Sequence, residues 1–361
     1  MHIDWSWIKQ RPQFLAEGLA NKFKLNVIFP KLKKSQSYKH ANISNSTKSD
    51  MKFSTTFQLP LRGRVKLIGF LNECLNHALF RINIAVFRPD FIWITYPPYS
   101  KYVPRSHSYK IIYDCMDDAE NFFTKNLSMR KLVAKQEMEL LNKSDAVIVS
   151  SQSLYELINR KLPISNKLHL VRNAFGGDVI NLPDVAEKVS GSFKIGYIGT
   201  ISGWFDFEVL EHCTKNIDNL EFHLIGPSEV NIPQNMKNIV FHGPVNHSEL
   251  FDKIQKYDCL IMPFKINDLI LSVDPVKLYE YINFNKPIIS ISYPEIQRFT
   301  DFVHFYTEKD SLLSLIENMV NNPTKLNKKY TSIDRKKFLK ANDWNSRLVK
   351  IQEVLCNLST E

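Results

Sequence analysis

A short segment near residue 275 combines a helix start, a cation and a carboxylate. Pro275 suits the first turn of a helix, because its missing N–H group costs nothing there, and we expect Ser272 or Asp274 to cap the free amides. Lys277 and Glu280 are three residues apart, so a helix places them on one face. A helix start favours an anion, so we expect the lysine to meet a phosphate and the glutamate to accept sugar hydroxyls. The alternative for Glu280 is a surface acid paired with Lys277.

Three glycines mark the end of a predicted strand and the turn after it. Gly196, Gly199 and Gly203 fall within and beyond residues 194–198, where glycine permits close backbone approach and a following helix directs amides at a diphosphate. The alternative is an ordinary strand-to-helix turn. Lys265 follows a later strand and is a second candidate cation for the pyrophosphate, with a solvated loop residue as its alternative.

A cluster of aspartates follows a predicted strand in the first half of the chain. Asp114, Asp117 and Asp118 lie where the loops of an open parallel sheet line a ligand crevice. Such carboxylates bind hydroxyl groups or hold a base. Asp118 is equally well explained as a helix cap, so Asp117 is the stronger candidate.

Length and charge restrict the class of protein. A chain of 361 residues is long enough for two domains, and its net charge of +10 is concentrated in residues 1–110, which carry +13. Five scattered cysteines show no metal-ligand spacing, so we expect reduced thiols and no metal site. No apolar run is long enough to span a membrane and no signal peptide is evident, which predicts a cytoplasmic protein.

Strand-like apolar runs alternate with helical periodicity along most of the chain. This alternation is typical of α/β proteins with parallel sheets. Helices are predicted near residues 8–23, 128–143 and 344–355, and strands over 25–29, 91–95, 111–113, 146–149, 168–171, 194–198, 221–225, 239–242, 259–263 and 287–291. Only residues 1–3 remain for a strand before the first helix, so either that strand is a stub or the start codon lies upstream.

Two segments of the first half stand out by composition. Residues 31–60 are rich in Lys, Ser and Asn and predict a flexible surface loop, a candidate lid or acceptor loop. The pattern of residues 61–86 predicts a basic amphipathic helix. It lacks a nucleic-acid-binding signature, so the partner we expect is an anionic membrane surface, and the alternative is packing of its apolar face into the domain.

Four ordered blocks carry a resemblance to a known family. They are residues 2–5 with 9–13, residues 113–118, residues 196–201 with 204–206, and residues 272–289. Together they resemble the nucleotide-sugar glycosyltransferases of the GT-B fold, in particular the family-four enzymes of bacterial cell-surface polysaccharide synthesis.

The resemblance implies two doubly wound Rossmann-like domains of α/β class facing a central cleft. Residues 1–175 would form the acceptor-side domain, residues 193–333 the donor domain, and residues 334–361 a helix crossing back to the first domain. The implied activity is metal-independent transfer of a hexosyl group with retention, from a UDP- or GDP-linked sugar to a glycan or lipid-linked acceptor. The sugar nucleotide is a substrate, so no cofactor is expected, and the protein would work in the cytoplasm or at the inner face of the plasma membrane.

The resemblance also assigns roles to individual residues. The acceptor side would include His2, Asp4, Asp117 and Asp118, and the catalytic set would be Asp117, Lys277 and Glu280. The donor-binding set would be Gly199, Thr200, Lys265, Ser272, Asp274, Pro275, Val276, Lys277 and Glu280.

One departure from the family pattern leaves two alternatives open. Many family-four enzymes carry two glutamates eight residues apart, whereas the position eight residues before Glu280 is Ser272. A catalytically impaired scaffold of a polysaccharide assembly complex is therefore one alternative. A nucleotide-sugar epimerase of similar fold is the other.

Overall fold

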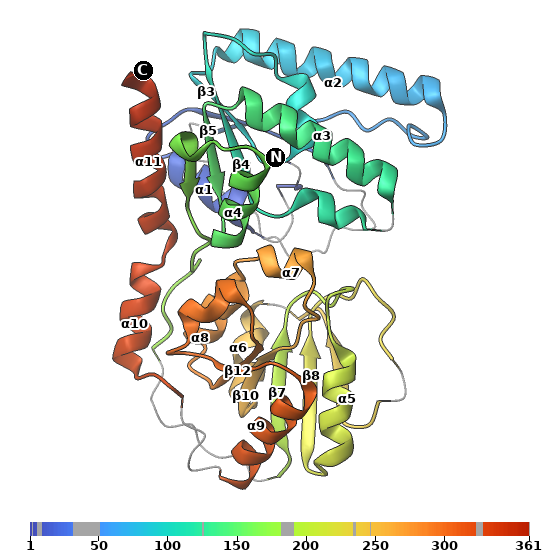
Figure 1. Cartoon of the computed structure of the whole chain (residues 1–361), viewed down its shortest axis with the longest axis vertical. Helices are drawn as coiled ribbons and strands as arrows, with labels where there is room; N and C mark the ends of the chain where they lie inside the picture. The colour runs from blue at the N-terminus through green and yellow to red at the C-terminus, as the bar shows by residue number, and fades with distance from the viewer. Residues whose placement is uncertain are drawn as a thin grey trace. The chain divides into compact units, whose positions relative to one another are not determined.

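The computed structural model comprises two compact units. It describes residues 1, 3–5, 9–31, 51–124, 126–181, 191–233, 236–245, 247–322 and 328–360. The first unit is Met1–Asn173 together with Trp344–Glu361, and the second is Ala174–Asp343 (Figure 1). The predicted α/β class with parallel sheets is confirmed in both units.

The second unit is built on one six-stranded parallel sheet. Its strand order is β12-β11-β10-β7-β8-β9, so the chain starts in the middle and extends the sheet in both directions. The point at which the order reverses lies between β7 and β10, which is where open α/β sheets bind ligands. The strands are β7 (Phe193–Ile198), β8 (Leu220–Ile225), β9 (Ile239–Gly243), β10 (Cys259–Met262), β11 (Ile288–Ile291) and β12 (His304–Tyr306).

Helices bury the central strands of this sheet. Every residue of β10 and β11 is buried, as expected of parallel strands covered on both sides. The helices are α5 (Phe207–Asn216), α6 (His247–Gln255), α7 (Asp268–Ser272), α8 (Val276–Asn283), α9 (Lys309–Asn321) and α10 (Ser332–Ala341). Figure 1 shows α5 and α9 next to each other, and they are in contact.

The first unit contains two separate parallel sheets. A four-stranded sheet has the order β3-β4-β5-β6, and β1 pairs with β2 alone. The strands are β1 (Leu25–Phe29), β2 (Met51–Thr55), β3 (Phe91–Ile94), β4 (Lys110–Cys115), β5 (Ala146–Val149) and β6 (Leu168–Leu170). The helices are α1 (Arg11–Leu19), α2 (Lys66–Phe87), α3 (Leu127–Lys143), α4 (Gln152–Lys161) and α11 (Trp344–Thr360).

Several sequence predictions need correction. The predicted loop over 31–60 contains a real strand, β2, which pairs in parallel with β1, while residues 32–50 lie outside the described part. Met1 and Ile3 form no strand, and the Met1 ammonium instead donates to the Ile28 carbonyl at 2.7 Å. Strand β12 has only three residues, too few for a sequence pattern. Helix α10 belongs to the second unit, so the segment that returns to the first unit starts at residue 344 rather than 334.

The carboxyl-terminal helix α11 is part of the first unit. It packs on α1, where the rings of Phe14 and Trp344 stack with centroids 5.1 Å apart. Gly18 leaves room for Leu348, because a Cβ at position 18 would lie 2.1 Å from a Leu348 methyl group. None of the described helices is both long enough and apolar enough to cross a lipid bilayer.

A buried ion pair connects α1 to the centre of the four-stranded sheet. Arg11 is 4% exposed, and its guanidinium lies 2.9 Å from the fully buried carboxylate of Asp114. The same guanidinium donates to the Val171 carbonyl at 2.7 Å, and the indole of Trp93 donates to Asp114 at 3.3 Å. Arg347 of α11 donates to the Asn173 carbonyl at 3.2 Å. The pair of Arg11 and Asp114 therefore links α1 to β4 and to Val171 after β6, and the predicted ligand-binding role of Asp114 stays a prediction.

We expect Arg11→Ala to lower the free energy of unfolding by roughly 3–5 kcal/mol, because it leaves a buried carboxylate without its partner. The matched control is Lys135→Ala, which breaks the exposed Lys135–Glu139 pair and should cost less than about 0.5 kcal/mol. Urea unfolding followed by tryptophan fluorescence measures both. Equal losses in the two variants would contradict the role given to Arg11.

Candidate functional site

The end of β7 holds a glycine that a lysine side chain covers. Gly199 follows the last residue of β7 and has φ of +144°, a conformation that favours glycine. A Cβ at this position would lie 1.9 Å from Cε and 2.8 Å from Nζ of Lys277. The structure thus brings together Gly199 and Lys277, which are 78 positions apart in the sequence.

A second glycine makes room for the first. Gly226 follows β8 and has φ of +138°, and a Cβ there would lie 2.1 Å from the Gly199 carbonyl oxygen. Sequence reasoning missed Gly226, although a glycine directly after a strand and before Pro227 was a usable signal. Gly196, by contrast, makes room for the ring of Tyr257, and Gly203 is exposed with open space around it.

Helix α8 begins beside this turn. Its N-cap residue is Pro275, in extended conformation, whose ring cannot accept a hydrogen bond from the first turn. The predicted capping by Ser272 or Asp274 stays a prediction. The Ser272 hydroxyl donates to the Leu269 carbonyl at 2.7 Å, within α7. The amides at a helix start interact favourably with an anion.

The Lys277 ammonium is held in a partly apolar setting. Its Nζ lies 5.8 Å from the ring centroid of Tyr197 and 5.6 Å from that of Phe264. Desolvation by the surrounding protein lowers the pKa of Lys277, and the nearby Glu280 carboxylate opposes that shift. A phosphate would supply the opposite charge that this desolvated cation favours.

Tyr281 fixes α8 at the reversal point of the sheet. Its hydroxyl accepts a hydrogen bond from the Ile198 N–H at 2.9 Å and contacts the carbonyls of Ile198 and Ile261 at 3.3 and 3.4 Å. Ile198 ends β7 and Ile261 lies in β10, so one buried phenol connects the two diverging strands to the helix that carries Lys277. The sequence indicated only that Tyr281 is apolar surface of the helix.

Asp274 is used inside the protein. Its carboxylate is fully buried and pairs with Arg298, which also donates to the Tyr279 hydroxyl at 2.9 Å. The Arg298 guanidinium lies 4.1 Å from the Phe299 ring centroid. The predicted contact of Asp274 with a donor stays a prediction, and the structure gives this carboxylate a role in holding the segment around Arg298 against α8.

The remaining predicted donor residues occupy varied positions. Lys265 is exposed and pairs with Glu208 at 3.2 Å, which agrees with the alternative of a solvated residue. The Thr200 carbonyl accepts from the Tyr197 hydroxyl at 2.8 Å, directly after Gly199. Val276 and Glu280 are half-buried on α8 and flank Lys277 along the helix.

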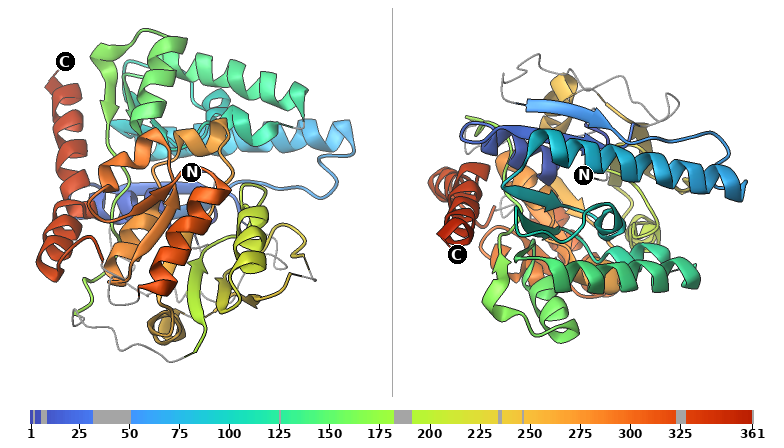
Figure 2. Two further views of the ribbon diagram at one scale, coloured as in Figure 1. Left: turned by 60° about the horizontal axis from the view of Figure 1, so that its bottom comes forward. Right: turned by 90° about the horizontal axis from the view of Figure 1, so that it is seen from above.

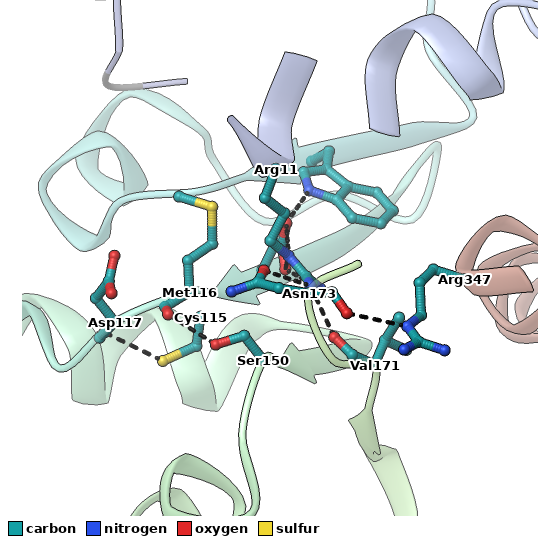
Figure 3. A network of polar contacts seen from close by, with 10 residues as sticks. Arg11, Cys115, Met116, Asp117, Ser150, Val171, Asn173 and Arg347 are labelled. Atoms are coloured by element: carbon teal, nitrogen blue, oxygen red, sulfur yellow. Dashed lines mark hydrogen bonds and ion pairs between the residues drawn. The ribbon is translucent and has the colours of Figure 1, made fainter. Parts of the chain in front are cut away.

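In the first unit, Asp117 lies in a pocket of about 300 Å³ at the end of β4. Aromatic, aliphatic and polar side chains line this pocket, including Thr95, Tyr96, Met116 and Phe122. Desolvation raises the pKa of Asp117 to about 6; Arg11 lowers it, and Asp114 and Asp118 raise it. The Cys115 thiol donates to the backbone carbonyl of Asp117 at 3.6 Å. In Figure 3 no dashed line reaches the Asp117 carboxylate.

The other predicted acceptor-side residues are placed less favourably. Asp118 is buried and accepts from Asn121 at 2.6 Å, at the start of the 3-10 helix Ala119–Phe123. Asp4 is buried, and its backbone carbonyl lies 3.5 Å from the Gln13 amide. His2 lies outside the described residues. Within the described ranges no three His, Cys, Asp or Glu side chains form a metal-binding cluster.

Comparisons with known proteins extend these observations. No family model matches the chain. A protein of Bacillus subtilis (strain 168) named "Putative teichuronic acid biosynthesis glycosyltransferase TuaH" is 24% identical over 243 residues, which cover 62% of this chain and 61% of that protein. The match thus spans less than two thirds of the relative.

Solved structures agree over nearly the whole length. The sucrose-phosphate synthase of Thermosynechococcus elongatus superposes with a TM-score of 0.70 at 14% identity, covering 97% of this chain and 92% of that one. HepE of Anabaena, solved in complex with UDP and glucose, superposes with a TM-score of 0.67 at 13% identity, covering 95% and 94%. The chain has the GT-B fold. The GT-B resemblance drawn from the four sequence blocks is thereby confirmed at the level of the fold.

We expect Gly199→Ala to lower stability by roughly 1–3 kcal/mol, because the new methyl group displaces Lys277 and strains the backbone. Gly203→Ala is the control in the same turn, since nothing lies within 4 Å of its added Cβ. Thermal unfolding measures the stability of both variants. A Gly199→Ala protein that behaves like Gly203→Ala would refute the packing of Lys277 on Gly199.

Proposed function

We propose that this GT-B protein is a glycosyltransferase that moves a sugar from a nucleotide-sugar donor to a cell-surface polysaccharide or lipid-linked acceptor, with retention of anomeric configuration. The observation that carries the proposal is Lys277, which covers Gly199 beside the start of α8 and at the reversal point of the sheet. Support comes from the name of TuaH and from HepE, whose structure was solved with UDP and glucose.

In this proposal the second unit stabilises charge on the leaving group. Breaking the bond between sugar and nucleotide leaves negative charge on the diphosphate. The Lys277 ammonium and the first amides of α8 are preorganised to stabilise that charge. Glu280, one turn after Lys277, is proposed to accept hydrogen bonds from the ribose hydroxyls. A UDP- or GDP-linked donor fits these groups equally.

The first unit is proposed to bind the acceptor. The pocket at Asp117 offers aromatic side chains beside a carboxylate, a combination that suits a sugar ring and one of its hydroxyls. Above a pH of about 6 the carboxylate is ionised and accepts a hydrogen bond from the attacking hydroxyl. The main contribution of the first unit to the reaction would be to position that hydroxyl for attack.

Product analysis separates transfer from the alternatives. A transferase releases the nucleoside diphosphate only when it also forms a new glycoside. An epimerase interconverts sugars without consuming an acceptor, and a scaffold gives neither product. A complete lack of turnover would favour the scaffold, because position 272 carries a serine where many family-four enzymes carry a glutamate.

We expect Lys277→Met to weaken binding of UDP or GDP roughly tenfold to a hundredfold, because a charge-assisted hydrogen bond to phosphate is lost. The stability of the ligand-free protein should stay the same or rise, since a desolvated cation is removed. Isothermal titration calorimetry and thermal unfolding measure the two effects. Lys215→Met, at an exposed residue paired with Glu211, is the control. Unchanged nucleotide affinity in Lys277→Met would remove the main support for the donor site.

Asp117 should give a pH dependence of stability that Asp117→Asn lacks. Because its pKa in the folded protein is raised from 3.8 to about 6, its contribution to stability is complete below pH 3.8 and is lost as the pH rises through 6. Melting temperatures of both proteins between pH 4 and 7 should therefore diverge in slope, with the native protein losing more on going to pH 7. Parallel curves would show that Asp117 titrates as it does in the unfolded chain.

A further inference from the structure

Helix α2 turns buried asparagines toward the protein, together with Phe80 and Ile84, which pack on the core of the first unit. Asn72 and Asn76 are 5% and 3% exposed, the lowest values on the helix. The Asn76 amide accepts from the Phe57 N–H at 2.8 Å and donates to the Phe57 carbonyl at 3.1 Å, while Asn72 accepts from the Leu59 N–H at 2.9 Å. These amides satisfy the backbone of an otherwise unpaired segment and thereby fix which side of α2 faces inward.

A further asparagine continues this attachment along the helix. Asn83 accepts from the Asn26 amide of β1 at 2.8 Å. With Asn72 and Asn76 it forms the asparagine row, which occupies one side of α2 over three turns. The opposite side of the helix must therefore point away from the unit.

That outward side is apolar. Leu67, Leu71, Leu75, Ile82 and Val86 follow one another at helical spacing and, with Phe70 beside them, form what we call the outer stripe. Their exposed fractions are 67%, 48%, 38%, 61% and 78%, and that of Phe70 is 65%. A 22-residue helix extends for about 33 Å, so the outer stripe is far longer than the single apolar side chains normal on a surface.

The figures show α2 at the margin of its unit. Seen from above in Figure 2, it runs in full view along one side of the first unit. The apolar surface continues into the residues before the helix, where Phe57, Leu61 and Val65 are 44%, 55% and 42% exposed. A shallow pocket of about 340 Å³, lined by Phe53, Val86 and others, adjoins its carboxyl end.

Positive charge accompanies the outer stripe. Residues 57–88 contain five basic side chains, all exposed: Arg62, Arg64, Lys66, Arg81 and Arg88. The one acidic residue in this range, Glu73, is engaged by Lys101 at 2.5 Å and by the Tyr102 hydroxyl at 2.8 Å. The surface therefore offers apolar side chains flanked by cations whose charge is not neutralised by Glu73.

We propose that α2 is an interfacial helix whose outer stripe inserts into an anionic lipid bilayer, with the five basic residues at the headgroups. An apolar face bordered by Lys and Arg is the arrangement that binds such a surface. The helix lies on the membrane, because no described helix is suited to crossing one. This inference stands on α2 alone and does not require the donor site.

Other occupants fit the same face less well. A second copy of the chain would bring five cations against five cations, which disfavours a symmetric dimer through α2. Residues 32–50 of this chain contribute only Leu32, Tyr38 and Ile43 as large apolar side chains, too few to match the outer stripe. A lipid surface complements both the apolar length and the charge.

Vesicle co-sedimentation of the full chain tests the proposal. We expect binding to vesicles of phosphatidylcholine mixed with phosphatidylglycerol, weaker binding to phosphatidylcholine alone, and release by salt. The double variant Leu71→Ser, Ile82→Ser should bind the mixed vesicles roughly tenfold more weakly for each side chain removed. Arg64→Gln and Lys66→Gln should each lower binding to the anionic vesicles about fivefold.

Matched controls keep the outcome decisive. The double variant Ile333→Ser, Val349→Ser removes equally exposed apolar side chains elsewhere, 77% and 55% exposed, and should bind vesicles like the native chain. Thermal unfolding checks that every variant is folded. Equal binding by the α2 variant and this control, or no binding to anionic vesicles, would overturn the proposal. So would a native dimer that the α2 variant converts to a monomer in the absence of vesicle binding.

Discussion

A parallel sheet that is covered on both faces leaves only the carboxyl ends of its strands for polar chemistry, and this constraint governs both units. The strands β10 and β11 are buried throughout, so their side chains only pack. Lys277, Gly199 and the start of α8 gather where β7 and β10 end. In the first unit, Asp117 follows the end of β4 in the same way. The candidate sites lie at these strand ends because the central strands of both sheets are buried along nearly all their length.

Local sequence patterns predicted the strands and the residues that follow them, because an apolar run and its end are local properties. They failed where the outcome depends on distant partners. Asp114 looks like Asp117 in the sequence, and only Arg11, 103 residues away, removes it from the accessible set. The strand β2 was hidden in a polar segment because its stability comes from pairing with β1. Tyr281 likewise acts through contacts that no spacing reveals.

Helix α2 shows a different limit of sequence reasoning. Its periodicity predicts one apolar and one polar side, and the ordinary expectation is that the apolar side faces the core. In the structure the inward side is mixed, because Phe80 and Ile84 pack on the core while Asn72 and Asn76 pair with backbone groups of residues 57–59. The helix therefore has apolar side chains on its outward side as well, which the amphipathic pattern alone does not predict.

The nested packing of Gly226, Gly199 and Lys277 makes these three positions interdependent in evolution. A methyl group at position 199 collides with Lys277, so its cost falls once that side chain has been shortened. A side chain at position 226 would push the Gly199 carbonyl and, through it, the same lysine. Substitutions here are therefore epistatic: a lineage that loses the lysine is released from the demand for glycine at 199, and regaining the lysine then requires the glycine to return first.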